Sequence, residues 1–148
     1  MDNTKVYDKY NWDNITYAHL EGKIKRVLDW IPGDVKTIAD IGCGNGVITN
    51  ILGEQYEVTG IDRSEIPLES VKTKKLAASA DDIPLPDNSF DLVFSSELLE
   101  DLPDEVLKGT VAEMKRLSNK YIFITVPNDE NPDKLSIQCP ACKYVFNS

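Results

Sequence analysis

A loop with three glycines constrains this chain more than any other feature of its sequence. Residues 39–47 read ADIGCGNGV, with Gly42, Gly44 and Gly46 set between two apolar runs. Glycine adopts positive φ angles without steric penalty and lets the backbone approach a ligand closely. A tight turn between a strand and a helix needs only one or two glycines, so this spacing predicts a ligand cradle.

The apolar pattern along the chain predicts alternating strands and helices. Runs of strand length lie at residues 37–41, 56–61, 76–79, 90–95 and 121–126. Helices are expected at residues 20–31, 47–52, 65–74 and 104–117. Such alternation builds right-handed crossovers and a parallel sheet covered on both faces. We therefore expect a doubly wound α/β fold, which binds ligands beyond the carboxyl ends of its strands, where the glycine loop lies.

Length, composition and charge restrict the class of protein. With 148 residues and 41% hydrophobic content, one compact domain is expected. Sixteen basic and twenty-five acidic side chains give a net charge of −9, which disfavours nucleic acid as a partner. No segment resembles a signal peptide or approaches the roughly 20 apolar residues of a membrane span. We expect a cytoplasmic protein with no membrane partner, whose three cysteines are reduced.

A carboxylate at the end of the second expected strand indicates a ribose. Asp62 lies twenty residues after Gly42 and closes the stretch EVTGID. A carboxylate at this place accepts hydrogen bonds from both ribose hydroxyls and repels a 2′-phosphate. Asp62 could instead be the N-cap of the next helix, because aspartate is favoured there. Together with the glycine loop, Asp62 favours an adenosine ligand without that phosphate.

Four stretches together resemble the class I S-adenosylmethionine-dependent methyltransferases, in particular their small-molecule branch. They are DIGCGNG at residues 40–46, GID at 60–62, ASADDIPLPDNSFDLVFSSELLEDLPDE at 78–105 and NKYIFITVPN at 119–128. The resemblance covers residues 36–127 and implies a Rossmann-like, mostly parallel sheet of strand order 3-2-1-4-5. A dehydrogenase would more often show G-x-G-x-x-G, whereas Val47 follows Gly44 by three residues. An NAD-linked oxidoreductase is therefore the weaker alternative.

The resemblance also implies which residues bind S-adenosylmethionine. Those expected around the cofactor are Asp40, Gly42, Cys43, Gly44, Asn45 and Gly46 at the loop, Asp62 and Arg63 at the ribose, Ser79, Ala80 and Asp81 at the adenine, and Ser95, Ser96 and Leu98 near the methionine end. Ile83 and Leu85 are expected to contact the faces of the adenine ring. The resemblance implies no catalytic residue. Asp101 stands where many relatives carry a histidine, so a mechanism in which that histidine acts as a base does not transfer to this chain. Glu97, Glu100 and Asp101 are expected in a solvated acidic loop.

Residues 1–35 are expected to form an N-terminal lid and the first helix. The aromatic residues Tyr7, Tyr10, Trp12 and Tyr17 either fold over the cofactor or cover the open face of the sheet, and both alternatives are open. A cationic sulfonium would also attract aromatic rings. His19, the only histidine, is expected at the surface.

Residues 128–148 form the tail of the same compact domain and depart most from the family. Cys139 and Cys142 stand in a Cys-x-x-Cys between two strand-like runs, at residues 135–138 and 143–146, which predicts a hairpin. Structural zinc takes four ligands, so the cysteines form only half a site. Three alternatives stay open for this pair. The cysteines are reduced without metal, or they form a zinc site completed by a second chain, as in a homodimer formed through the tail, or by residues outside this sequence, or they are redox-active.

Family members normally continue through two further strands where this tail stands. The function expected is transfer of a methyl group from S-adenosylmethionine to a small molecule. The alternative is a domain that binds S-adenosylmethionine or S-adenosylhomocysteine for regulation, or with a partner, without methyl transfer of its own.

Overall fold

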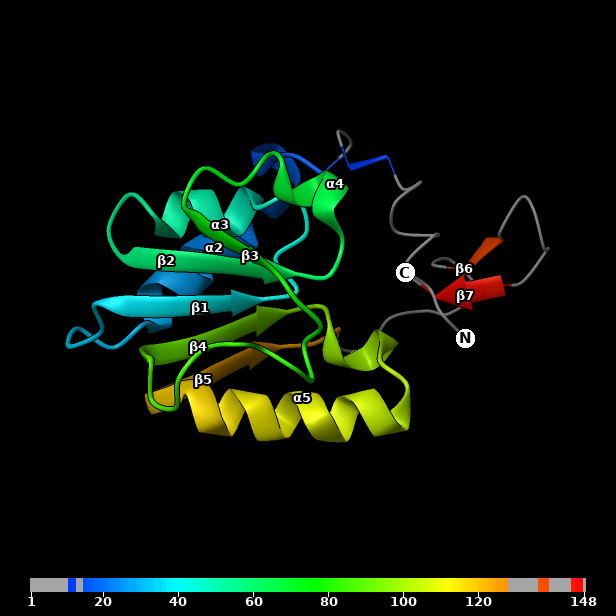
Figure 1. Ribbon diagram of the computed structural model, residues 1–148. Helices are drawn as coiled ribbons and strands as arrows, with labels where there is room; N and C mark the ends of the chain where they lie inside the picture. Colours follow the sequence, from blue (N-terminus) through cyan, green and yellow to red (C-terminus); the bar gives the residue numbers. More distant parts are fainter. Residues whose placement is uncertain (1–10, 13–14, 128–135, 139–144, 148) are drawn as a thin grey trace.

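The computed structural model describes residues 11–12, 15–127, 136–138 and 145–147, and its centre is a five-stranded sheet. The strands are β1 (Thr37–Ile41), β2 (Glu57–Asp62), β3 (Lys74–Ala77), β4 (Phe90–Ser96) and β5 (Ser118–Thr125). Their order is β3-β2-β1-β4-β5 and every neighbouring pair is parallel, so the predicted fold and strand order are confirmed. All five strands therefore end at one edge of the sheet (Figure 1).

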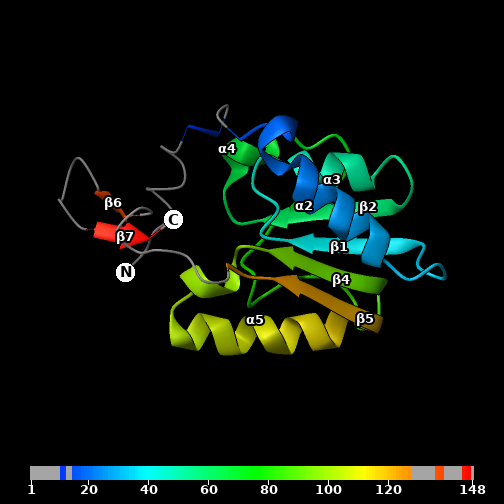
Figure 2. The ribbon, with the colours of Figure 1, turned by 180° about the vertical axis from the view of Figure 1, so that it is seen from behind.

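Helices cover the two faces of this sheet. They are α2 (Tyr17–Trp30), α3 (Val47–Leu52), α4 (Glu65–Leu68) and α5 (Asp104–Leu117), with a 3₁₀ turn η2 at Leu99–Asp101. Figure 2 shows α2 and α3 lying across the strands on one side, while α5 packs against the other face. Among the helices of the described chain, none combines the length and apolar character that a membrane span requires.

Alternating side chains of β1 and β4 divide the core into two halves. Ile38 and Phe94 pack with Val27 of α2 and Leu52 of α3. Ala39, Ile41 and Val93 point to the opposite face, where they pack with Met114 and Leu117 of α5. Both faces of the central strands are therefore buried, as parallel sheets require.

Charged residues in the first and last turns stabilise helix α5. Asp104 and Glu105 lie in the first turn, and Lys115 and Arg116 lie in the last. These charges oppose the partial charges at the two helix ends and stabilise the helix by a few tenths to about 1 kcal/mol each. As a result α5 extends as a regular helix along the sheet from the loop after β4 to the start of β5.

The helix predicted at residues 65–74 is shorter than expected. Helix α4 ends at Leu68, and the next residues form turns in which the Ser70 and Val71 N–H groups donate to the carbonyls three residues earlier. Val71 is buried against the glycines of the neighbouring loop and strand. From Lys74 the chain pairs with β2, so β3 also begins earlier than the predicted residue 76. Pairing with a neighbouring strand overrides the local pattern here.

The tail contains a separate antiparallel pair of short strands. These are β6 (Ser136–Gln138) and β7 (Val145–Asn147), and Ile137 lies opposite Phe146 in the ladder. Both fall within one or two residues of the predicted runs. Cys139 and Cys142 lie outside the described residues, so the Cys-x-x-Cys tip stays a prediction.

Candidate functional site

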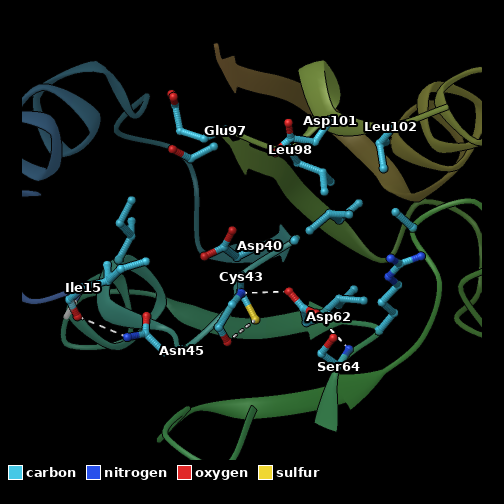
Figure 3. Close-up of a pocket in the computed structure, with 18 of the residues that line it drawn as sticks. Ile15, Asp40, Cys43, Asn45, Asp62, Ser64, Glu97, Leu98, Asp101 and Leu102 are labelled. Carbon is cyan, nitrogen blue, oxygen red and sulfur yellow. Dashed lines mark hydrogen bonds between the residues drawn. The ribbon is translucent and has the colours of Figure 1, made fainter. Parts of the chain in front are cut away.

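A cavity of about 290 Å³ lies at the carboxyl ends of β1, β2 and β4. This volume is close to the lower limit of typical small-molecule sites, about 300–1,000 Å³. Figure 3 shows Asp62 and Ser64 at one end, Glu97 and Leu102 at the other, and Asp40 between them. The cavity thus follows the edge of the sheet where the sequence predicts the ligand.

The glycine loop forms one wall of the cavity, and its three glycines have φ angles of 77°, 54° and 74°. Four of its N–H groups are hydrogen-bonded within the protein: those of Gly42 and Cys43 to the Ile61 carbonyl, that of Gly44 to the Asp62 carboxylate and that of Gly46 to the Cys43 carbonyl. A phosphate site at a helix start depends on N–H groups that point at the ligand. The loop therefore suits a ligand without phosphate.

Close packing around the loop explains why glycines are needed. A Cβ on Gly44 would lie 2.6 Å from Cζ3 of Trp12, and one on Gly42 would lie 2.9 Å from the Leu98 methyl carbons. The Asn45 side-chain amide donates to the Trp12 carbonyl at 2.8 Å and to the Ile15 carbonyl at 3.1 Å. These contacts join the N-terminal segment to the loop and place Trp12 in the cavity wall.

Asp40 is a buried carboxylate at the centre of the cavity. It is 3% exposed, and its Oδ2 accepts a hydrogen bond of 2.6 Å from the Thr49 hydroxyl. Burial raises the pKa of Asp40 to about 7; the Thr49 hydrogen bond lowers the pKa, and the nearby Asp62 charge raises it. A cation in the cavity would favour the ionised form of Asp40.

Asp62 links the glycine loop to the start of α4. Its Oδ2 accepts the Gly44 N–H at 2.9 Å, and its Oδ1 accepts the Ser64 N–H at 2.9 Å. The N-cap of α4 is Ser64, so the alternative role of Asp62 as the N-cap is not what the structure shows. A carboxylate offers lone pairs for about four hydrogen bonds. Asp62 therefore keeps acceptor capacity for the hydroxyls of a ligand.

The opposite end of the cavity is built around Glu97, directly after β4. Glu97 has a φ of 54°, and its N–H donates to the Thr125 carbonyl at 3.0 Å. Its carboxylate forms an ion pair of 2.9 Å with Lys23 of α2, and the Thr125 hydroxyl donates to Ser96 at 2.8 Å. A left-handed conformation at a non-glycine residue costs about 1–3 kcal/mol and is concentrated at functional sites. Glu97, Glu100 and Asp101 are all exposed, as expected of a solvated loop, and Glu97 and Asp101 also line the cavity.

The cavity wall contains all the predicted cofactor-binding residues except Gly46, Asp81 and Ser95. Gly46 instead packs against Val71, where a Cβ would lie 2.6 Å from a methyl carbon. The buried Ser95 hydroxyl donates to the Ile41 carbonyl at 2.9 Å and so joins β4 to β1. Asp81 lies one residue beyond the wall and accepts a hydrogen bond from the Ser79 hydroxyl.

Several other expectations concern side chains near the cavity. Ile83 and Leu85 pack in the core rather than in the cavity wall. Burial raises the pKa of the Cys43 thiol, which therefore stays protonated. His19 is exposed, as predicted, and its Nδ1 lies in a hydrogen bond of 3.0 Å with the Thr16 hydroxyl. The described residues contain no group of three or more His, Cys, Asp or Glu that could hold a metal.

Sequence reasoning missed part of the cavity wall. The residues missed include Ile15, Leu20, Lys23, Leu102, Pro103 and Val106. Helical spacing identified Leu20 as an apolar position of α2, but no local signal indicates that α2 and the segment before α5 face the same cavity. Only the packing of the folded chain brings them together.

A family model described as a methyltransferase domain matches residues 39–121 of the chain. A 27-O-demethylrifamycin SV methyltransferase from Amycolatopsis mediterranei is 34% identical over 111 residues, which cover 63% of this chain and 40% of the relative. A ubiquinone biosynthesis O-methyltransferase from Stutzerimonas stutzeri is 26% identical over 137 residues, or 80% of this chain and 57% of the relative. The chain thus spans about half the length of these relatives.

Solved structures agree with the fold. Phosphoethanolamine N-methyltransferase 1 of Haemonchus contortus, in complex with phosphoethanolamine and S-adenosylhomocysteine, superimposes with a TM-score of 0.74 at 24% identity. The match covers 88% of this chain and 33% of that protein.

Proposed function

This chain belongs to the class I S-adenosylmethionine-dependent methyltransferases, and we propose that its cavity binds S-adenosylmethionine for methyl transfer to a small molecule. The observation that carries the proposal is the pairing of two carboxylates, Asp40 and Asp62, with a glycine loop whose N–H groups are engaged within the protein. Such a site attracts positive charge and disfavours phosphate. S-adenosylmethionine has the matching chemistry, because it carries a sulfonium and an ammonium group and no phosphate.

In this proposal the cofactor extends along the edge of the sheet. Asp62 accepts hydrogen bonds from the ribose hydroxyls, and Arg63, Ser79 and Ala80 lie beside the adenine. The backbone from Gly42 to Asn45 follows the methionine part, with Asp40 near its ammonium group. Gly46 and Asp81 support these positions from outside the cavity wall.

Methyl transfer would take place toward the Glu97 end of the cavity. When bound, S-adenosylmethionine supplies an electrophilic methyl group, and the acceptor must be held close and in line with it. Leu98, Leu102 and Val106 supply apolar surface there that excludes water, while Lys23 and Glu97 supply charge that can orient a polar group. Positioning of this kind can provide most of the catalysis, so no general base is assigned.

The acceptor we propose is a hydroxyl group on a largely apolar small molecule. The names of the relatives from Amycolatopsis mediterranei and Stutzerimonas stutzeri both specify O-methylation of small molecules, which supports this class. The mixture of apolar side chains and one ion pair at the Glu97 end agrees with such an acceptor.

Production of S-adenosylhomocysteine against a panel of phenols, alcohols and amines tests the activity. We expect turnover with hydroxyl acceptors and a higher KM for the acceptor in Lys23→Met, with the affinity for S-adenosylmethionine unchanged. Lys25→Met, on the same helix but outside the cavity wall, is the matched control. Cofactor binding without turnover of any acceptor would favour the alternative of a binding domain.

We also propose that Cys139 and Cys142 bind zinc and that two chains form a homodimer through their tails. Metal analysis of the purified protein tests the first, and light scattering with and without a chelator tests the second.

A further inference from the structure

The chain between β3 and β4 runs along α5 and is held there by Arg116 (Figure 1). The Arg116 guanidinium donates to the carbonyl oxygens of Ile83 at 2.8 Å and Leu85 at 2.6 Å, and it pairs with the Asp87 carboxylate at 2.9 Å. A planar guanidinium fixes several acceptors in one geometry, which a lysine cannot reproduce. Arg116 therefore fixes the position of this connection, although it does not line the cavity.

Glu113 completes the attachment one turn earlier on α5. Its Oε2 accepts the Ile83 N–H at 2.9 Å, and its two oxygens accept hydrogen bonds of 2.7 Å and 2.6 Å from Arg116. Both backbone groups of Ile83 are thus bound to α5 side chains, and the Ile83 side chain is 2% exposed in the core. Because charged partners make the stronger hydrogen bonds, Ile83 is a fixed point of the connection.

A tight turn directly before Ile83 reaches the cavity. The Asp82 N–H donates to the Ser79 carbonyl at 3.1 Å, and Ser79 and Ala80 line the cavity. On its other side the turn touches α5, where a Cβ on Gly109 would lie 2.6 Å from the Asp81 Cβ. The turn therefore lies between the ligand cavity and α5, with Ser79 and Asp82 still exposed to solvent.

The hydrogen bond within this turn sets the polarity of its cavity edge. Asp81 accepts a hydrogen bond from the Ser79 hydroxyl, because an ionised carboxylate can only accept. The Ser79 oxygen is left with lone pairs and no proton to offer. Such an edge accepts a hydrogen bond from the exocyclic amine of adenine, whereas a 6-oxo base offers only an acceptor at that position.

We propose that Glu113 and Arg116 are positioning residues that set the base preference of the nucleoside site. They hold the Ser79–Asp82 turn at the distance where Ser79 meets the exocyclic amine. The inference rests on the proposed function, since it takes Ser79 and Ala80 as the residues beside the base. It adds that base recognition depends on two side chains of α5 outside the cavity.

The test is calorimetric titration with S-adenosylhomocysteine and with S-inosylhomocysteine, which differs only in having a 6-oxo base. We expect the wild-type protein to bind S-adenosylhomocysteine at least tenfold more tightly. In Arg116→Met the ratio of the two affinities should fall to about threefold or less, chiefly because the affinity for S-adenosylhomocysteine is lost. Lys115→Met, an exposed neighbour on α5, should keep the wild-type ratio. A purely structural weakening would lower both affinities equally and leave the ratio unchanged.

Two further variants keep the inference testable if Arg116→Met does not fold. Gly109→Ala adds a favourable helix residue but displaces Asp81, so it should lower the same ratio without removing any polar contact. Glu113→Gln keeps an acceptor for the Ile83 N–H and should show a smaller loss. If the ratio of the two affinities is unchanged in both Gly109→Ala and Arg116→Met, this inference is overturned while the proposed function stands. Failure of the wild-type protein to bind S-adenosylhomocysteine overturns the proposed function and, with it, this inference.

Discussion

The Thr49 hydroxyl donates a hydrogen bond of 2.6 Å to the buried carboxylate of Asp40, joining the helix after the glycine loop to the strand before it. Burial raises the pKa of Asp40 to about 7, so both protonation states are populated near neutral pH. Protonation of this one group therefore affects both the stability of the protein and its affinity for a cation.

The first prediction concerns stability. The ordinary pKa of 3.8 applies to Asp40 in the unfolded chain, whereas folded Asp40 titrates at about 7. Between these values the folded state binds more protons, so the free energy of unfolding falls as the pH rises, by at most about 1.4 kcal/mol per pH unit. Denaturant unfolding of wild type and Asp40→Asn from pH 4 to 8 isolates this contribution. The free energy of unfolding of wild type minus that of Asp40→Asn should fall as the pH rises. A value that stays flat or rises with pH would contradict the raised pKa of Asp40.

A second prediction links ligand binding to proton release. Binding of cationic S-adenosylmethionine beside Asp40 favours the ionised carboxylate, so at pH 6 the complex should release close to one proton. Calorimetry in two buffers with different ionisation enthalpies measures this release directly. Asp40→Asn should show none of it. Equal proton release from the variant would mean that another group titrates.

The third prediction tests the ribose contact. Asp62→Ala should weaken S-adenosylhomocysteine binding by about 1–3 kcal/mol, because it removes charged hydrogen bonds to the ligand and leaves the Gly44 and Ser64 N–H groups unpaired. Asp62→Asn retains one acceptor oxygen and should lose less. Calorimetric affinities for the three proteins provide the comparison. Equal affinity in Asp62→Ala and wild type would remove Asp62 from the ribose site.

The fourth prediction concerns the contact between Gly44 and Trp12. Alanine at position 44 must adopt a φ near 54° and displace the indole, so Gly44→Ala should lower S-adenosylhomocysteine affinity at least tenfold. Truncation by Trp12→Ala in the same chain should recover part of the loss, because it removes the steric conflict. Gly33→Ala is the control, since its Cβ would meet no atom within 4 Å. Fully additive effects of the two substitutions would show that Trp12 is not the obstacle.

Much of the fold followed from local sequence patterns. Apolar runs and the glycine loop predicted the parallel sheet, because both depend on periodicity and on turn chemistry that act over a few residues. The strand order was implied by the resemblance to the methyltransferase family. The α4 region was predicted less well, since Val71 and Lys74 take their conformations from packing and pairing with β2.

The candidate site divides in the same way. The glycine loop and Asp62 lie at strand ends, where position alone predicted that they lie at the ligand cavity, whereas the place of Asp40 was implied by the family resemblance. Lys23 and Glu97 come from distant segments that meet only after folding, and the left-handed backbone of Glu97 has no sequence signature. The attachment of Ile83 to Arg116 likewise depends on two elements thirty-three residues apart.

Calorimetric titration of the purified chain with S-adenosylmethionine, S-adenosylhomocysteine and NAD tests whether the cavity binds S-adenosylmethionine. We predict one site per chain for the first two ligands and no binding of NAD. Saturable binding of NAD without binding of either S-adenosyl compound would contradict the account.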